Sequence, residues 1–224
     1  MSHSPHPVIA IDGTAASGKS TFSRQLAQRL GYIYVNTGAM YRGVTWYLQE
    51  KKIPLHEAGA VAREIEAAGI KTQLKEGELV FLIAGIDPLP HVREGRVNAD
   101  VSIVAQIPEV RSRLVAEQQS LAAQGPLVME GRDIGTVVFP KTPYKFFLDA
   151  DAAVRAQRRS QQGENDVILK RDAIDQQRQH SPLTCAPDAM RLDSGRATVE
   201  ELVAMALKHL VERGLELSSH LKTK

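Results

Sequence analysis

The chain has 224 residues, of which 43% are hydrophobic and 24% charged, and its formal net charge is +2. This composition is typical of a soluble globular protein with one well-buried domain and room for a small insert. The small net charge argues against a nucleic-acid-binding surface, and no apolar run reaches the roughly 18 residues that span a membrane. One cysteine, Cys185, excludes an internal disulfide and a cysteine-based metal cluster. We therefore expect a monomeric cytoplasmic protein that acts on small molecules, without a nucleic acid or membrane partner.

Runs typical of strands alternate with amphipathic runs along most of the chain. The strand-like runs are residues 7–12, 32–36, 126–133, 143–150 and 188–194. The helix-like runs are residues 21–31, 37–52, 57–69, 108–125 and 198–214, the last with a capping box at Thr198 and Glu201. This alternation predicts an α/β fold, in which a parallel five-stranded sheet is flanked by helices.

Two segments interrupt the alternation. Residues 70–87 form two extended runs around the turn KEGE, which predicts a small antiparallel hairpin inside an insert at about 37–97. Residues 151–179 are polar and rich in arginine, which is typical of a closing lid. We expect one domain, with its core at about 8–36, 98–150 and 180–213.

The segment from Gly13 to Ser20, GTAASGKS, matches G-x-x-x-x-G-K-[ST] between a predicted strand and a predicted helix. Glycines in such a P-loop let backbone N–H groups point at phosphate oxygens, and Lys19 reaches the β- and γ-phosphates. Ser20 holds Mg²⁺ in this motif. The expected ATP-binding residues are Gly13, Thr14, Ala15, Ala16, Ser17, Gly18, Lys19, Ser20 and Thr21.

The rest of the sequence separates the classes of protein that use a P-loop. A nucleotide switch needs N-K-x-D and D-x-x-G motifs, and neither occurs. A motor needs a longer chain. A transferase with a small acceptor is therefore favoured, and a non-catalytic P-loop protein stays an alternative.

Arginines near the predicted strand ends could bind such an acceptor. Arg42 lies on the helix after the second strand, and Arg132 and Asp133 follow the apolar segment LVME of the third. Two further sets have spacings that put each set on one helix face: Arg155, Arg158 and Arg159, and Arg171, Asp175 and Arg178. Arginines donated to a transferring phosphoryl group accelerate transfer by about 10³–10⁵-fold. The alternative is that Arg155 and Arg171 form exposed i,i+4 ion pairs with Asp151 and Asp175.

Five motifs together resemble the bacterial cytidylate kinases, from about residue 8 to 213. They are IDGTAASGKST, NTGAMYR, EGRDIGTVVFP, FLDA and KRDAIDQQR. The resemblance implies transfer of the ATP γ-phosphate to CMP or dCMP, which gives CDP or dCDP and ADP, with Mg²⁺ as cofactor. It also implies a parallel-sheet core, a substrate-binding insert with a small sheet, and an Arg-rich lid. A kinase for UMP, dTMP or another phosphorylated acceptor stays an alternative.

The resemblance also implies roles for individual residues. Thr37 and Arg42 would hold the CMP side, Arg132 would grip its phosphate, and Asp133 would accept from the cytosine amine. Ser102 and Arg111 resemble the other base-reading positions. The lid-hinge residues that resemble the family's sugar and phosphate contacts are Arg171, Asp175 and Arg178. The expected catalytic residues are Lys19, Arg132, Arg155, Arg158 and Arg159.

Three positions depart from the family pattern. Thr14 replaces a common proline, which we expect to loosen the loop slightly. Asn36 replaces an aspartate, so any role for a carboxylate at that position is in doubt. Glu130 replaces an aspartate found in some members, and a water-mediated role at Mg²⁺ would survive that change.

Overall fold

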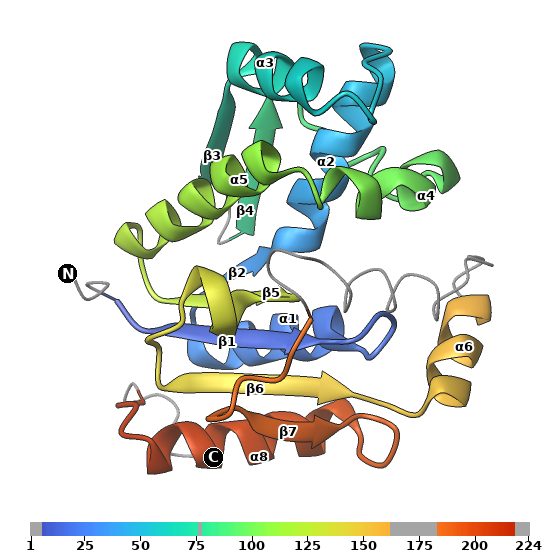
Figure 1. The fold of residues 1–224 in the computed structure, drawn as a ribbon. Helices are drawn as coiled ribbons and strands as arrows, with labels where there is room; N and C mark the ends of the chain where they lie inside the picture. The colour runs from blue at the N-terminus through green and yellow to red at the C-terminus, as the bar shows by residue number, and fades with distance from the viewer. Residues whose placement is uncertain (1–5, 76–77, 162–182, 218–224) are drawn as a thin grey trace.

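A computed structural model describes residues 6–75, 78–161 and 183–217. Its sheet has the strand order β3-β4-β2-β5-β1-β6-β7 (Figure 1), in which β3 is Ile70–Lys75 and β4 is Glu78–Ile83. The predicted five-stranded parallel sheet is confirmed. Its strands are β1 (Val8–Gly13), β2 (Ile33–Asn36), β5 (Leu127–Gly131), β6 (Tyr144–Asp149) and β7 (Met190–Asp193). Because all five run in one direction, their carboxyl ends share one edge of the sheet.

Helices cover both faces of the core sheet, which explains why β1 and β5 are buried along their whole length. On one face α1 (Lys19–Leu30) and α8 (Val199–Glu212) pack with the strands in one apolar cluster that includes Phe22 and Phe146. The other face is covered by η1 (Leu121–Ala123) and the π-helical turn η2 (Ile134–Val138). The predicted capping box at Thr198 and Glu201 opens α8.

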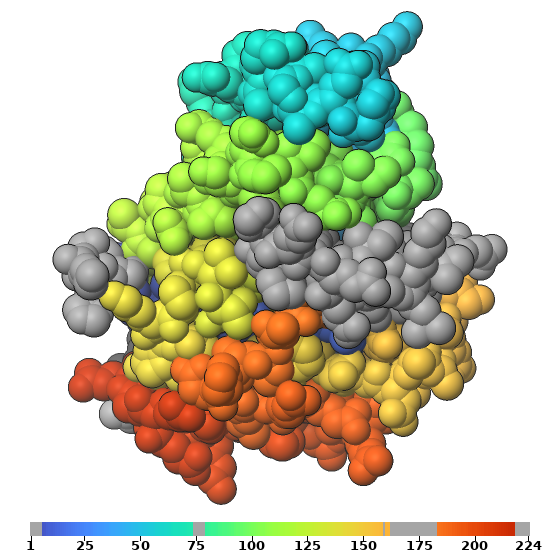
Figure 2. Space-filling model, in the orientation of Figure 1, coloured from blue at the N-terminus to red at the C-terminus, as the bar shows by residue number. Residues whose placement is uncertain are grey.

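The segment between β2 and β5 forms an insert that extends the sheet beyond β2 (Figure 1). Its elements are α2 (Thr37–Glu50), α3 (Ala58–Ala68), β3 (Ile70–Lys75), β4 (Glu78–Ile83), α4 (Gly95–Val104) and α5 (Pro108–Ser120). They share one apolar cluster that runs from Met40 to Leu114. In Figure 2 this part, cyan to green, lies above the yellow-to-red core. The predicted hairpin is present, and it joins the core sheet through a single pairing of Tyr34 with Glu78.

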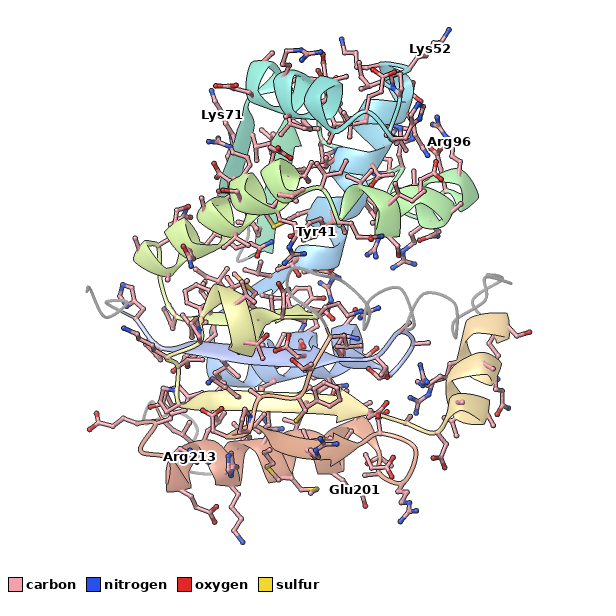
Figure 3. The ribbon with its side chains drawn as sticks, viewed as in Figure 1. Tyr41, Lys52, Lys71, Arg96, Glu201 and Arg213 are labelled. Carbon is pink, nitrogen blue, oxygen red and sulfur yellow. The ribbon has the colours of Figure 1, made fainter. Side chains whose placement is uncertain are left out.

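Helix α2 carries the insert away from the sheet edge. Gly43 lies on its packed face, where an added Cβ would come within 2.6 Å of the Pro88 ring and 3.0 Å of Phe81. Figure 3 shows Tyr41 of α2 between the insert and the core, whereas Lys52, Lys71 and Arg96 lie on the outer surface of the insert. The residues of α2 predicted to bind substrate therefore lie at the end of the helix that meets the core.

Candidate active site

The P-loop connects β1 to α1, and its two fixed glycines have different structural roles. Gly13 adopts φ 153°, and a Cβ there would lie 1.9 Å from the Leu148 carbonyl oxygen of β6. Gly18 caps α1 in the left-handed region at φ 84°. A side chain at either position would displace the loop from the strand ends or strain its backbone. The first turn of α1 is thus held at the carboxyl edge of the sheet.

Lys19 lies inside the curve of the loop and is only 7% exposed. Its ammonium group donates to the Thr14 carbonyl at 2.5 Å and lies 3.3 Å from the Ser17 hydroxyl. Ser20 and Thr21 are exposed at the start of α1. The loop therefore encircles a positive charge at a helix N-terminus, an arrangement that binds phosphate.

Thr14 makes a side-chain hydrogen bond that a proline at this position could not make. Its hydroxyl donates to the Asp149 carboxylate at 2.7 Å. Asp149 ends β6 and also accepts from the Ala150 N–H at 2.9 Å. The side chain of Thr14 thus ties the loop to the adjacent strand.

Helix α6 (Ala152–Gln161) brings two predicted lid arginines to the loop. Arg155 is 7% exposed and donates to the carbonyls of Ala150 at 3.0 Å and Ala15 at 3.3 Å. Because Arg155 is buried, it does not form the exposed surface ion pair with Asp151 that was the alternative interpretation. Arg158 donates to Ser194, which follows β7. The side chain of Arg159 and all of Arg171, Asp175 and Arg178 lie outside the described residues.

The predicted acceptor residues gather at the next strand end. Arg132 donates to the Gly13 carbonyl at 3.0 Å, so it touches the P-loop directly. Asp133 forms a buried ion pair with Arg111 of α5, and the Arg111 guanidinium lies 5.8 Å from the centre of the Tyr41 ring. The structure thus brings together two of the three predicted base-reading side chains.

The remaining acceptor residues lie on the insert. Ser102 is 6% exposed on α4. Thr37 opens α2 and its hydroxyl donates to the Glu130 carbonyl at 2.7 Å. Arg42 is half-buried one turn further along α2. We did not predict α4 as a helix, because its apolar residues include the β-branched Val97, Val101 and Ile103, which suit strands as well.

Asn36 has a role that requires no charge. Its side-chain oxygen accepts from the Ala39 N–H at 2.9 Å and caps α2, and its amide donates to the Tyr34 hydroxyl at 3.3 Å. Tyr34 in turn donates to the Glu130 carboxylate at 2.5 Å. Burial and the neighbouring Glu130 carboxylate raise the pKa of Tyr34, so the phenol stays protonated and keeps donating. Tyr34 was not among the predicted site residues.

Asp12 lies near the end of β1, directly before Gly13 of the P-loop, and no role was predicted for its side chain. It is 3% exposed and accepts from the N–H groups of Ile134 at 2.7 Å and Gly135 at 2.8 Å. The carboxylate therefore fixes the turn that follows Arg132 and Asp133. Burial raises the pKa of Asp12 to about 6, against the opposing effect of these two hydrogen bonds.

The raised pKa of Asp12 predicts a pH-dependent contribution to stability. As the pH rises from about 4 to 6, the unfolded chain releases this proton before the folded chain does, so ionisation disfavours folding. Between pH 4.5 and pH 7 we expect the unfolding free energy of the wild type to fall by about 2 kcal/mol relative to Asp12→Asn. Denaturant titrations of both proteins measure this difference, and a pH-independent difference would contradict the raised pKa.

Among the described residues, no three histidine, cysteine, aspartate or glutamate side chains are grouped to hold a metal ion. In the same part of the chain, no helix is both long and apolar enough to cross a membrane.

A cavity of about 470 Å³ beside Tyr47, Glu64 and Lys71 lies within the insert, and its lining includes no residue of the P-loop.

The fold is that of an α/β P-loop kinase. A P-loop lies at the carboxyl edge of a parallel sheet, Arg132 contacts this loop, and the buried Arg111–Asp133 pair lies next to Arg132. The family model described as cytidylate kinase matches residues 9–212. The chain belongs to the cytidylate kinase family. This membership supports its assignment as a nucleoside monophosphate kinase, a transferase.

Individual proteins that are similar in sequence to this chain carry the same family name. A cytidylate kinase from Geobacillus sp. (strain WCH70) is 39% identical over 92% of this chain and 96% of its own length. One from Caldicellulosiruptor bescii is 40% identical over 89% of this chain and 93% of its own length. A bifunctional pantoate ligase/cytidylate kinase from Synechococcus sp. (strain RCC307) is 41% identical, and the match spans 41% of that longer protein.

Proposed function

We propose that this protein transfers the γ-phosphate of ATP to CMP or dCMP. The observation that carries the proposal is the buried Arg111–Asp133 pair, whose aspartate directly follows Arg132, an arginine hydrogen-bonded to the P-loop. Arg132, which contacts the phosphate-binding loop, and Asp133, which belongs to the buried polar pair, are thus adjacent in the chain. They suit a phosphorylated acceptor that carries a polar base.

On the donor side, the loop N–H groups and Lys19 would hold the β- and γ-phosphates. From α6, Arg155 donates to the Ala15 carbonyl of the loop and Arg158 lies beside Gly18, and both would neutralise charge on the transferring group. Arg159, Arg171, Asp175 and Arg178 are proposed to complete the lid and its hinge.

On the acceptor side, Arg132 would bind the CMP phosphate next to the P-loop, with Thr37 and Arg42 approaching from α2. Asp133 would accept from the exocyclic amine of cytosine, while Arg111 holds its carboxylate in place and Ser102 contributes a hydroxyl. A site built for an amine discriminates against uracil, because its buried acceptor would lose a donor.

The reaction needs positioning more than acid–base chemistry. An oxygen of the CMP phosphate attacks the γ-phosphorus, a new P–O bond forms, and the bond to ADP breaks with ADP as the leaving group. The acceptor oxygen is already anionic at neutral pH, so no general base is required. The protein's part is to align the two phosphates and exclude water.

Mg²⁺ fits this site as a nucleotide-bound ion. Mg²⁺ is typically held by one or two side chains together with substrate phosphates, rather than by a cage of protein ligands. Ser20, at the exposed start of α1, would supply one oxygen, and Glu130 would act through water. When bound, the ion neutralises charge on the β- and γ-phosphates.

The test is ADP formation with Mg-ATP and each of CMP, dCMP, UMP, AMP, GMP and dTMP. We expect rapid turnover mainly with CMP and dCMP. If the enzyme used a different monophosphate, the kinase assignment would stand. The base-reading roles of Ser102, Arg111 and Asp133 would then be wrong. No turnover with any of them, in a folded protein that binds ATP, would contradict the proposal.

A further inference from the structure

Ser194 lies directly after β7, where the P-loop meets the lid helix. The residue is 7% exposed. Its hydroxyl lies 2.7 Å from the Ser17 carbonyl, to which it donates, and 3.2 Å from the Asp149 carbonyl. Its backbone N–H also donates to the Asp149 carbonyl, at 2.9 Å. Ser194 is therefore fixed against both the P-loop and the end of β6.

The same serine holds Arg158 of α6 at two points. One guanidinium nitrogen donates to the Ser194 hydroxyl at 2.9 Å, and another donates to the Ser194 carbonyl at 2.6 Å. The guanidinium lies beside Gly18, since a Cβ there would be 3.6 Å from Nη1 of Arg158. Gly18 caps α1, whose N-terminus is the anion-binding end of the loop.

We propose that Ser194 is a positioning residue that holds the Arg158 guanidinium at the phosphate-binding loop. An unrestrained arginine side chain samples many rotamers, so two hydrogen bonds to a buried, fixed partner pre-organise its charge for phosphate. The hydroxyl is central, because the same group accepts from Arg158 and donates to the loop carbonyl of Ser17. The identity of the phosphate ligand as ATP rests on the proposed function.

The test is a double-mutant cycle of Ser194→Ala and Arg158→Ala, with Mg-ATP affinity measured by calorimetry in the absence of an acceptor. We expect each single variant to weaken Mg-ATP binding by about tenfold, and the double variant to weaken it by about the same tenfold. The turnover number with CMP should show the same non-additive pattern. Ser120→Ala is the matched control, because Ser120 is exposed on α5 and its hydroxyl donates to the Glu117 carbonyl at 2.7 Å.

Two results would overturn the proposal. Additive losses, about a hundredfold in the double variant, would mean that Ser194 shapes the loop without acting through Arg158. Unchanged or tighter binding by Ser194→Ala would mean that the serine does not position Arg158 for phosphate. Because the calorimetric cycle needs no acceptor, it stays decisive even if the wild type forms no CDP, which would instead refute the proposed function.

Discussion

Replacing Arg132 with alanine is expected to lower kcat/KM for CMP by about 10³-fold or more, with little loss of fold stability. The arginine follows β5, and its guanidinium reaches the Gly13 carbonyl of the P-loop. It therefore lies where the donor and acceptor phosphates would meet, and its charge would stabilise the transferring group. Removing the hydrogen bond to Gly13 costs about 1 kcal/mol, which lowers the thermal midpoint by about 2–4 °C in a domain of this size.

The matched control for Arg132 is Arg113→Ala. Arg113 pairs with Glu117 at 2.9 Å on α5 and donates to the Ile70 carbonyl at 3.4 Å, so it makes comparable contacts outside the site. We expect this variant to keep near-normal turnover. A large fall in midpoint with near-normal turnover in Arg132→Ala would identify Arg132 as a structural arginine.

The sequence predicted those parts of the site that depend on local pattern. The P-loop is contiguous in the chain and lies between a strand and a helix of clear periodicity, so its position at the sheet edge followed from the topology. Arg132 and Asp133 also follow a strand, and the parallel sheet brings that strand end beside the loop. Such residues are identified by where their strand ends.

The sequence could not predict contacts that depend on distant backbone groups. Asp12 accepts from N–H groups more than a hundred residues away in the chain, and only the η2 turn brings them within reach. In the sequence Tyr34 is an ordinary aromatic residue of a strand, and only the structure shows that its hydroxyl donates to the Glu130 carboxylate. Ser194 follows a short edge strand whose sequence carries no motif. In each case the informative atom is a partner supplied by tertiary packing.

Replacing Asp133 with alanine is expected to reduce both stability and base discrimination. The carboxylate is buried with the Arg111 guanidinium, and both residues are about 5% exposed. Removing it leaves a buried, uncompensated charge, which costs about 3–5 kcal/mol of unfolding free energy. We also expect kcat/KM for CMP to fall by about 10²-fold and the preference for CMP over UMP to narrow by at least about tenfold, because the proposed acceptor for the cytosine amine is gone.

A double variant separates these two effects. Adding Arg111→Met to Asp133→Ala removes the uncompensated charge and fills the space with an apolar side chain, so most of the lost stability should return. The CMP preference should stay lost, because alanine has no acceptor and the methionine thioether is only a weak one. Denaturant titration measures the first quantity, and kcat/KM for CMP and UMP measures the second. A stable double variant that still prefers CMP would show that the Arg111–Asp133 pair does not recognise the base. The cytosine amine would then need an acceptor elsewhere in the site.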